Sequence, residues 1–124
     1  MEDLESRTKR YAIAVIRLYR QLPGDSVGQV LGRQLLRSGT SVGAHYREAK
    51  RARSTAEFVA KIGGGLQELE ETRYWCELVD EACKLPSSHL KPFLQETEEL
   101  IAILTQCAKN AKNRSGKNMK GQAG

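Results

Sequence analysis

Apolar residues recur along most of the chain in alternating steps of three and four residues, which is the spacing of one face of an α-helix. The pattern is clearest over residues 4–22, 58–83 and 90–111. No segment shows the alternation of apolar and polar residues that is typical of a half-buried strand. The pattern therefore predicts an all-α protein, and a length of 124 residues fits a single domain.

Turn and capping signals divide the chain into four helical segments. Residues 22–25 (LPGD) and 85–88 (LPSS) combine proline with small or polar residues, as turns do. Ser54 and Glu57 have the spacing of a capping box. In that motif the serine hydroxyl accepts from the Glu57 N–H, and the Glu57 carboxylate accepts from the Ser54 N–H.

From these signals we expect helices over about residues 3–21, 26–51, 55–84 and 88–112. Asp25 or Ser26 is available as the N-cap of the second helix. Short connections favour antiparallel neighbours, so the expected architecture is an up-down-up-down four-helix bundle. Residues 113–124 have no apolar pattern, and we expect them to form a flexible basic tail.

The second predicted helix has two distinctive faces. At about 100° per residue, four arginines share a polar stripe roughly 27 Å long. They are Arg33, Arg37, Arg47 and Arg51. Glycines lie at the edge of the apolar side, at positions 28, 32, 39 and 43. Because a glycine inside a helix costs about 1 kcal/mol relative to alanine, we expect these positions to let a neighbouring helix approach closely.

Two further glycine-rich stretches affect the expected geometry. Residues 38–44 form the weakest helix-forming stretch of the second segment, and we expect a bend or irregular turn near them. Gly63, Gly64 and Gly65 interrupt the third segment. A phosphate-binding loop is disfavoured there, because no strand precedes the glycines and no GK[ST] motif follows them. Close packing is therefore the favoured interpretation.

The net charge of +5 is unevenly distributed. Residues 26–53 carry six basic residues and one acidic residue, whereas residues 54–84 carry three basic and seven acidic residues. This asymmetry favours binding to nucleic acid or association of opposite charges between subunits. The candidate nucleic-acid-binding residues are Arg33, Arg37, Arg47, Lys50, Arg51, Arg53, Arg114, Lys117 and Lys120. The alternative is a solvated face, or a contact between the basic second helix and the acidic third helix of a neighbouring subunit.

The sequence offers little for catalysis or cofactor binding. A di-metal site in a bundle uses Glu-x-x-His, which is absent from the chain, so we expect no metal or other cofactor. No serine or cysteine has an evident histidine-and-acid set, so we expect no enzyme activity. Cys76, Cys83 and Cys107 fall on or beside apolar stripes, which is typical of reduced core thiols in a cytoplasmic protein.

Three other residues have competing interpretations. Glu48 lies beside the arginine stripe, where we expect it to pair with Arg51 or with a residue of another helix. For Tyr74 and Trp75, packing in the core or at an interface is favoured over stacking on a nucleic-acid base.

The chain has no apolar run of about 18 residues, so we expect no helix that spans a membrane and no membrane contact of that kind.

Residues 36–49 (LRSGTSVGAHYREA), 54–62 and 66–78 together resemble the signature of a family of bacterial four-helix bundle proteins. That family includes the proteins encoded in intervening sequences of large-subunit ribosomal RNA genes. The likeness covers about residues 8–112. The chain departs from the pattern at His45, where asparagine is common, and at Gly43, where many relatives have proline.

The resemblance implies an up-down-up-down bundle that closes into a homopentameric ring. The chain is also similar to the accessory proteins of diversity-generating retroelements, which are basic pentamers that bind nucleic acid and a reverse transcriptase. The resemblance brings no catalytic residues. The expected function is thus a non-enzymatic oligomeric bundle that associates with RNA or DNA through a basic face. The alternative is a protein-interaction scaffold without a nucleic-acid role.

Overall fold

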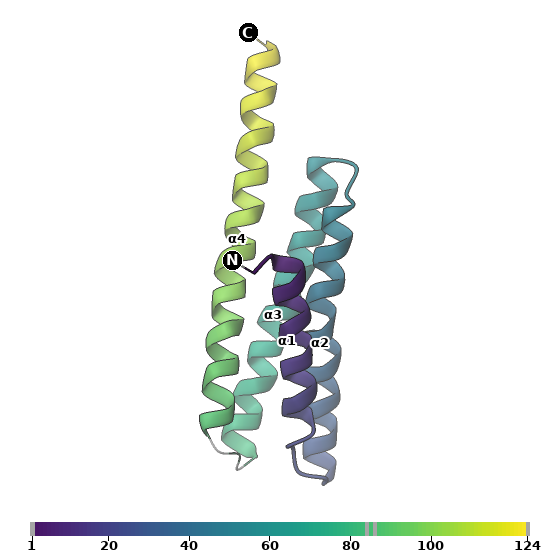
Figure 1. The fold of residues 1–124 in the computed structure, drawn as a ribbon, viewed down its shortest axis with the longest axis vertical. Helices are drawn as coiled ribbons and strands as arrows, with labels where there is room; N and C mark the ends of the chain where they lie inside the picture. The colour runs from purple at the N-terminus through teal and green to yellow at the C-terminus, as the bar shows by residue number, and fades with distance from the viewer. Residues whose placement is uncertain (1, 84, 86, 124) are drawn as a thin grey trace.

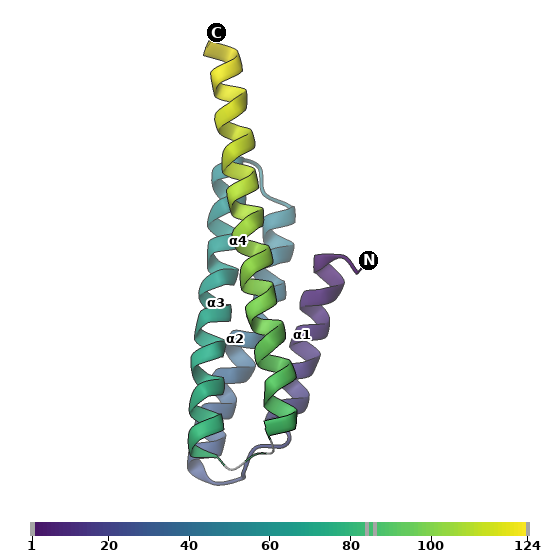
Figure 2. The ribbon, with the colours of Figure 1, turned by 90° about the vertical axis from the view of Figure 1, so that its left-hand side faces the viewer.

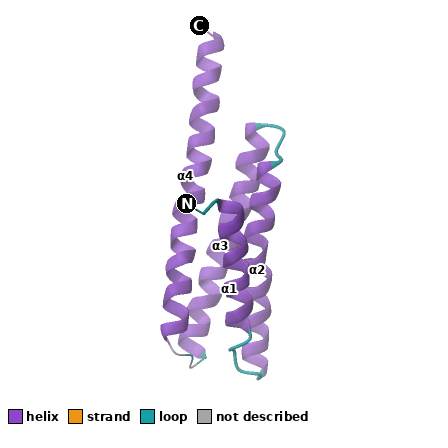
Figure 3. Ribbon diagram, viewed as in Figure 1, coloured by secondary structure: helices purple, strands orange, loops and turns teal. Residues whose placement is uncertain are grey.

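The computed structural model describes residues 2–83, 85 and 87–123 and is an all-α four-helix bundle. The helices are α1 (Leu4–Tyr19), α2 (Ser26–Lys50), α3 (Thr55–Ala82) and α4 (Ser87–Ala123). In Figures 1 and 2 the chain reverses direction at each connection, and α4 rises beyond the turn between α2 and α3. Figure 3 shows helices and loops and no strand in these residues. The predicted fold class is confirmed.

Local signals set most helix ends. The Asp25 side chain caps α2 by accepting from the Gly28 N–H at 2.8 Å. The Ser54 hydroxyl caps α3 by accepting from the Glu57 N–H at 3.1 Å, as the capping box predicts. The Glu57 carboxylate, however, accepts from the Arg53 N–H at 3.4 Å, one residue earlier than expected. The return bond of the motif is therefore displaced by one position.

Three of the four glycines of α2 allow α1 to pack closely, as predicted, whereas a Cβ at Gly28 would clash with the Pro23 carbonyl oxygen in the preceding turn. A Cβ at Gly39 would lie 3.0 Å from both γ-methyls of Val15, and a Cβ at Gly43 would lie 3.2 Å from the Thr8 hydroxyl oxygen. A Cβ at Gly32 would lie 2.6 Å from the ring of Tyr19. The three glycines thus form a surface without side chains, on which three turns of α1 rest.

The irregular turn expected near residues 38–44 is absent, because α2 is helical through all of them. The hydroxyl groups of Ser38, Thr40 and Ser41 donate to carbonyl oxygens four residues earlier, at 2.9, 2.5 and 2.6 Å. These hydroxyls therefore find hydrogen-bond acceptors within their own helix and do not interrupt its backbone hydrogen bonds. Packing against α1 on the glycine side holds the stretch in place.

The glycines of α3 receive a side chain from α2. A Cβ at Gly64 would lie 2.7 Å from Nδ1 of His45, and a Cβ at Gly65 would lie 3.6 Å from both His45 and Leu104. Packing is therefore confirmed for these two positions. Nothing lies within 4 Å of a Cβ at Gly63, and the structure gives no reason for glycine there.

The core is a continuous cluster of aliphatic side chains with two polar links. Fully buried members include Val15, Leu35, Val42, Leu69 and Leu100. The Tyr11 hydroxyl bonds the Thr97 hydroxyl at 2.6 Å and joins α1 to α4. The Thr72 hydroxyl donates to the Ser38 hydroxyl at 2.7 Å and joins α3 to α2. Helix α1 approaches α4 less closely than it approaches α2.

The backbone of residues 113–123 is helical, so α4 continues beyond the predicted helix end at residue 112. No proline follows Pro92, and among the described residues no glycine takes a positive φ that would end a helix. The apolar pattern stops near Ala111, which is 7% exposed. The helix therefore continues beyond its last residue that packs in the core. Lys117 and Lys120 lie on this continuation.

Candidate nucleic-acid interface

The arginines of the α2 stripe differ in whether they have an ion-pair partner. Arg37 pairs with Glu68 of α3 at 3.3 Å and with Glu71 of the same helix. Its guanidinium is thus committed within the chain. The expected contact between basic helix two and acidic helix three exists at this position, but it forms within one subunit.

Arg47 and Lys50 have one weak partner between them. The Glu5 carboxylate of α1 lies 3.8 Å from Arg47 Nε and 3.9 Å from Lys50 Nζ. About half of each of these three side chains is exposed. Exposed ion pairs contribute about 0–1 kcal/mol, so a phosphate can replace Glu5 at little cost.

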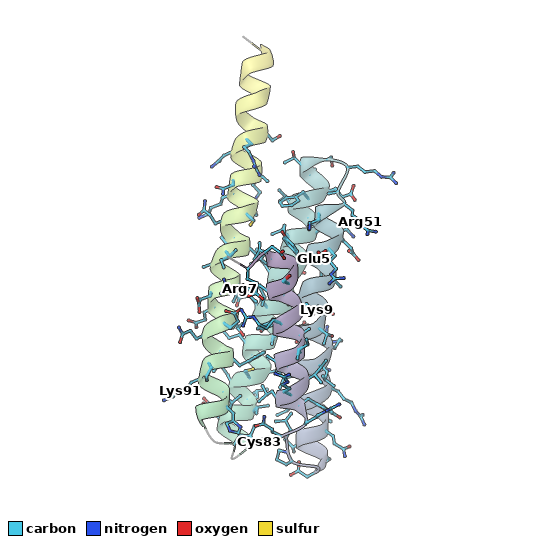
Figure 4. The ribbon with its side chains drawn as sticks, in the orientation of Figure 1. Glu5, Arg7, Lys9, Arg51, Cys83 and Lys91 are labelled. Atoms are coloured by element: carbon cyan, nitrogen blue, oxygen red, sulfur yellow. The ribbon has the colours of Figure 1, made fainter. Side chains whose placement is uncertain are left out.

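The guanidinium groups of Arg33, Arg51 and Arg53 have no carboxylate within 4.0 Å among the residues that the structure describes. Arg51 caps the C-terminal end of α2, and Arg53 lies in the turn that leads to α3. Figure 4 shows Arg51 at one end of the bundle and Lys91 and Cys83 at the other. The unpaired arginines of the turn therefore project from one end of the molecule.

A shallow hollow at this end is lined by Arg51, Arg53, Glu57, Glu48 and Lys61. Glu48 pairs with Lys61 of α3 at 3.0 Å, which confirms the pairing with another helix and not with Arg51. The hydrogen bond from Lys61, and then its charge, lower the pKa of Glu48. The cations of the hollow outnumber its acids, and one of the acids is already neutralised by an ion pair.

The last turns of α4 add cations on the same end. Lys109, Lys112 and Arg114 are exposed, and α4 passes the turn between α2 and α3 in Figures 1 and 2. The described backbone carries Lys117 and Lys120 further along the same helix. Three of the cations at this end, Lys61, Lys109 and Lys112, are not among the residues predicted from the sequence. The last two had a visible signal, because no acidic residue follows Glu99.

The nine predicted residues therefore do not form one site. Arg47, Lys50, Arg51 and Arg53 are brought together at one end of the bundle, which the basic part of α4 shares. Arg33 lies 14 residues before Arg47 on the same helix, which separates them by about 21 Å. Arg33 and Arg37 belong to the middle of the bundle.

The remaining polar chemistry of the molecule is dispersed. Nδ1 of His45 and Nε1 of Trp75 are buried without a hydrogen-bond partner among the described residues. Trp75 packs against the core, and Tyr74 is 53% exposed beside it. Burial raises the pKa of the Cys76 thiol to about 12. Within the described residues no three His, Cys, Asp or Glu side chains gather as metal ligands.

A groove runs between α1 and α4, lined by Arg10, Tyr11, Phe93 and Glu96 among others. Arg7 donates two hydrogen bonds to Glu96, at 2.7 and 2.9 Å, and Tyr11 stacks on Phe93 with ring centroids 4.8 Å apart. Glu96 is thus paired with Arg7 and Arg10, and His89 with Gln21, whereas Arg17 of this groove forms no ion pair within the described residues. No helix in the described parts of the chain is long and apolar enough to cross a membrane.

Comparison with known proteins identifies relatives of this bundle. The sequence model of the 23S rRNA-intervening sequence protein family matches residues 3–106. A crystal structure from Bacteroides thetaiotaomicron, described as a protein of unknown function from the S23 ribosomal protein family, is 31% identical. The similarity covers 86% of this chain and 99% of that one, with a TM-score of 0.80. No curated protein matches the chain.

Proposed function

Because the chain belongs to the 23S rRNA-intervening sequence protein family, we propose that it is a non-enzymatic oligomeric bundle that associates with nucleic acid. The observation that carries this proposal is the basic end of the bundle, formed by Arg47, Lys50, Arg51 and Arg53 together with the last turns of α4. The side chains of Arg51 and Arg53 form no ion pair among the described residues. Phosphate groups of RNA or DNA would neutralise them.

Electrostatics favours this kind of ligand. Binding of a cation to a phosphate releases condensed counterions, and this term supplies most non-specific affinity for nucleic acid. Arginine suits the contact, since its planar guanidinium binds phosphate oxygens through two hydrogen bonds. The weak pairs of Arg47 and Lys50 with Glu5 offer little competition.

The proposal that the protein is not an enzyme rests on the state of its nucleophiles. Burial holds the pKa of Cys76 near 12, so this thiol stays protonated at neutral pH. Burial also raises the pKa of Cys107. The three cysteines are free, which suits the reducing cytoplasm, where we place the protein.

Oligomerisation is a separate part of the proposal. Large apolar side chains stand exposed on two helices, with Val27 52% and Val30 57% exposed on α2, and Ile13 39% exposed on α1. Contact between subunits would cover such side chains. We propose a homopentamer, as the resemblance implies. Light scattering on the purified protein measures the subunit number directly.

One observation favours the alternative, a protein-interaction scaffold. Val27 and Val30, with Ser26 and Leu31, line an almost wholly apolar hollow at the start of α2. A protein partner suits this hollow better than a nucleic acid does. The hollow lies at the opposite end of α2 from Arg47 and Arg51, so the two functions use different surfaces.

The test measures binding of labelled RNA and DNA by fluorescence anisotropy at about 50 mM and about 200 mM salt. We expect binding that weakens steeply over this range, and loss of binding in the triple variant Arg47→Glu, Arg51→Glu, Arg53→Glu. Arg33→Glu, an exposed arginine in the middle of the same helix, is the control. Absence of binding at the lower salt concentration rejects the proposal. Dissociation of the oligomer by the triple variant favours an interface instead.

A further inference from the structure

The net charge of the molecule resides entirely in its C-terminal segment. Residues 107–124 hold five basic residues and no acidic one, whereas residues 1–106 hold fifteen basic and fifteen acidic residues. Residues 1–106 therefore have no net charge, because acidic residues elsewhere in the bundle balance the charges of Arg47, Lys50, Arg51 and Arg53. A distant polyanion is attracted by net charge, so the attraction comes from the last turns of α4.

This segment also leaves the bundle. Ala111 is the last residue of α4 that the described side chains show as buried. Leu104 lies opposite Gly65 of α3, and α3 begins ten residues before Gly65, at Thr55. Because both helices have the same rise, α4 passes the start of α3 near Arg114 and extends about 14 Å further. Figures 1 and 2 show this projection. We name residues 112–123 the α4 arm.

We propose that the α4 arm binds duplex DNA by entering its major groove. This inference rests on the proposed function, and it specifies duplex DNA as the nucleic acid and the α4 arm as the element that binds it. An α-helix is about 10–12 Å across, and the major groove of B-DNA is about 12 Å wide. A continuous helix that leaves a helical bundle to lie in this groove is also the geometry of basic helix-loop-helix proteins.

The other nucleic acids fit the α4 arm less well. The major groove of duplex RNA is deep and narrow, and side chains cannot read it. Single strands are bound on aromatic side chains that stack on their bases, and residues 107–124 contain no aromatic residue. The segment is instead rich in the side chains that contact phosphates and base edges of DNA, with five basic residues, three asparagines and one glutamine.

The arm lies beyond the part of the chain that the family model matches. The family match ends at residue 106, so the whole segment that carries the net charge lies outside it. Removing the charge of the arm therefore leaves the packed bundle and the cations Arg47, Lys50, Arg51 and Arg53 in place. The two basic regions can be separated by mutation in the full-length protein.

The first experiment compares two quadruple variants of the full chain, with circular dichroism to verify that both are folded. The arm variant carries Lys112→Gln, Arg114→Gln, Lys117→Gln and Lys120→Gln. The control carries Lys9→Gln, Arg17→Gln, Arg20→Gln and Lys91→Gln, which remove as much charge from exposed residues of the body. None of the four control residues forms an ion pair within the described residues.

The probe is a labelled DNA duplex of about 20 base pairs, compared with the same sequence as duplex RNA and as single-stranded DNA. We expect the wild type to prefer duplex DNA. The arm variant should bind it at least tenfold more weakly at about 50 mM salt, with a salt slope lower by about 3 to 4. The control should bind within about threefold of the wild type, because its residues lie away from the α4 arm.

A second variant separates a helix in the groove from a merely basic segment. Gly116→Pro keeps every cation and interrupts the helix at the middle of the arm. We expect it to lose the preference for duplex DNA while it retains a weak, salt-sensitive affinity for all three probes. Binding of duplex DNA by Gly116→Pro at wild-type strength overturns the proposal, as does equal or tighter wild-type binding of either other probe.

The outcomes also separate this proposal from the proposed function. If the arm variant binds like the wild type and the Arg47, Arg51, Arg53 variant does not, the arm proposal fails and the basic end of the bundle stands. If the wild type binds none of the three probes at low salt, both fail. If it binds poly-glutamate as tightly as duplex DNA of equal charge, the partner is an acidic protein and the arm proposal is rejected.

Discussion

Helix α2 meets its two neighbours in different ways. Toward α1 it presents glycines, on which Val15, Thr8 and Tyr19 rest, and its ion pairs with α1 in the described residues are the two weak ones from Arg47 and Lys50 to Glu5. Toward α3 it presents polar groups, among them the Ser38 hydroxyl bonded to Thr72 and the Arg37 guanidinium paired with Glu68. The first interface depends on the glycines of α2, whereas the second combines matched polar groups with the α3 glycines that receive His45. Steric matching leaves little freedom, whereas polar matching can be lost one pair at a time.

The glycine interface should show the largest effect. In Gly39→Leu the new side chain enters the space of the Val15 methyls, which lie 3.0 Å from a Cβ at this position. Overpacking of this kind costs about 1–3 kcal/mol or more, against about 1 kcal/mol gained in helix propensity. We expect a net loss of about 2 kcal/mol in urea unfolding. An unchanged urea midpoint would mean that α1 can shift away from α2 without loss of stability.

The buried hydroxyl pair of the α2–α3 interface comes next. In Thr72→Val the one hydroxyl proton that the Ser38 oxygen and the Glu68 carbonyl share is lost, although Ser38 keeps its bond to the Gln34 carbonyl. We expect a loss of about 1–2 kcal/mol in the free energy of unfolding. Thr40→Val is the matched control, because the Thr40 hydroxyl is exposed. Equal effects of the two substitutions would contradict a specific role for the buried pair.

Adjacent glycines of α3 test the contact with His45. Gly63→Ala adds a methyl group to open space and should stabilise the protein by up to about 1 kcal/mol through helix propensity. Gly64→Ala places its Cβ 2.7 Å from Nδ1 of His45, and the clash should cancel that gain. The double variant Gly64→Ala, His45→Ala separates the clash from propensity. If Gly63→Ala and Gly64→Ala stabilise equally in thermal unfolding, His45 does not constrain the interface.

The ion pairs at the edge of the α2–α3 interface should matter least. Arg37→Gln removes the pairs with Glu68 and Glu71, but about half of the Arg37 side chain is exposed. We expect a loss below about 1 kcal/mol that shrinks as salt screens the charges. Arg33→Gln, on the same stripe without an acidic partner among the described residues, should have no effect. A larger loss for Arg33→Gln than for Arg37→Gln would reverse this interpretation.

Local features were predictable because they depend on neighbouring residues. Asp25 and Ser54 cap helices from positions that the turn chemistry indicates. The close approach at Gly39 was also foreseeable, since four glycines in one helix require a compensating contact. The sequence did not reveal that Val15 supplies this contact. Nor did it reveal that His45 occupies the space beside Gly64, because both depend on the relative rotation of two helices.

The candidate interface was less predictable for the same reason. Helical periodicity placed Arg37 and Arg47 on one stripe, and it had no means to distinguish them. Glu68 lies 31 residues after Arg37, so their ion pair exists only when α2 and α3 are packed in register. The helical backbone of residues 113–123 was missed because an amphipathic pattern identifies helices that pack, and this one projects beyond the core.

The sequence alone determined the number of helices, the N-cap of α3, the side of α2 that packs closely and the place of every charge. Each of these depends on interactions within a few turns of one helix. Only the tertiary structure decided which cations are neutralised by the chain itself and which remain available at the basic end. Whether a charge is paired depends on distances between helices, and the packing of the whole core sets those distances.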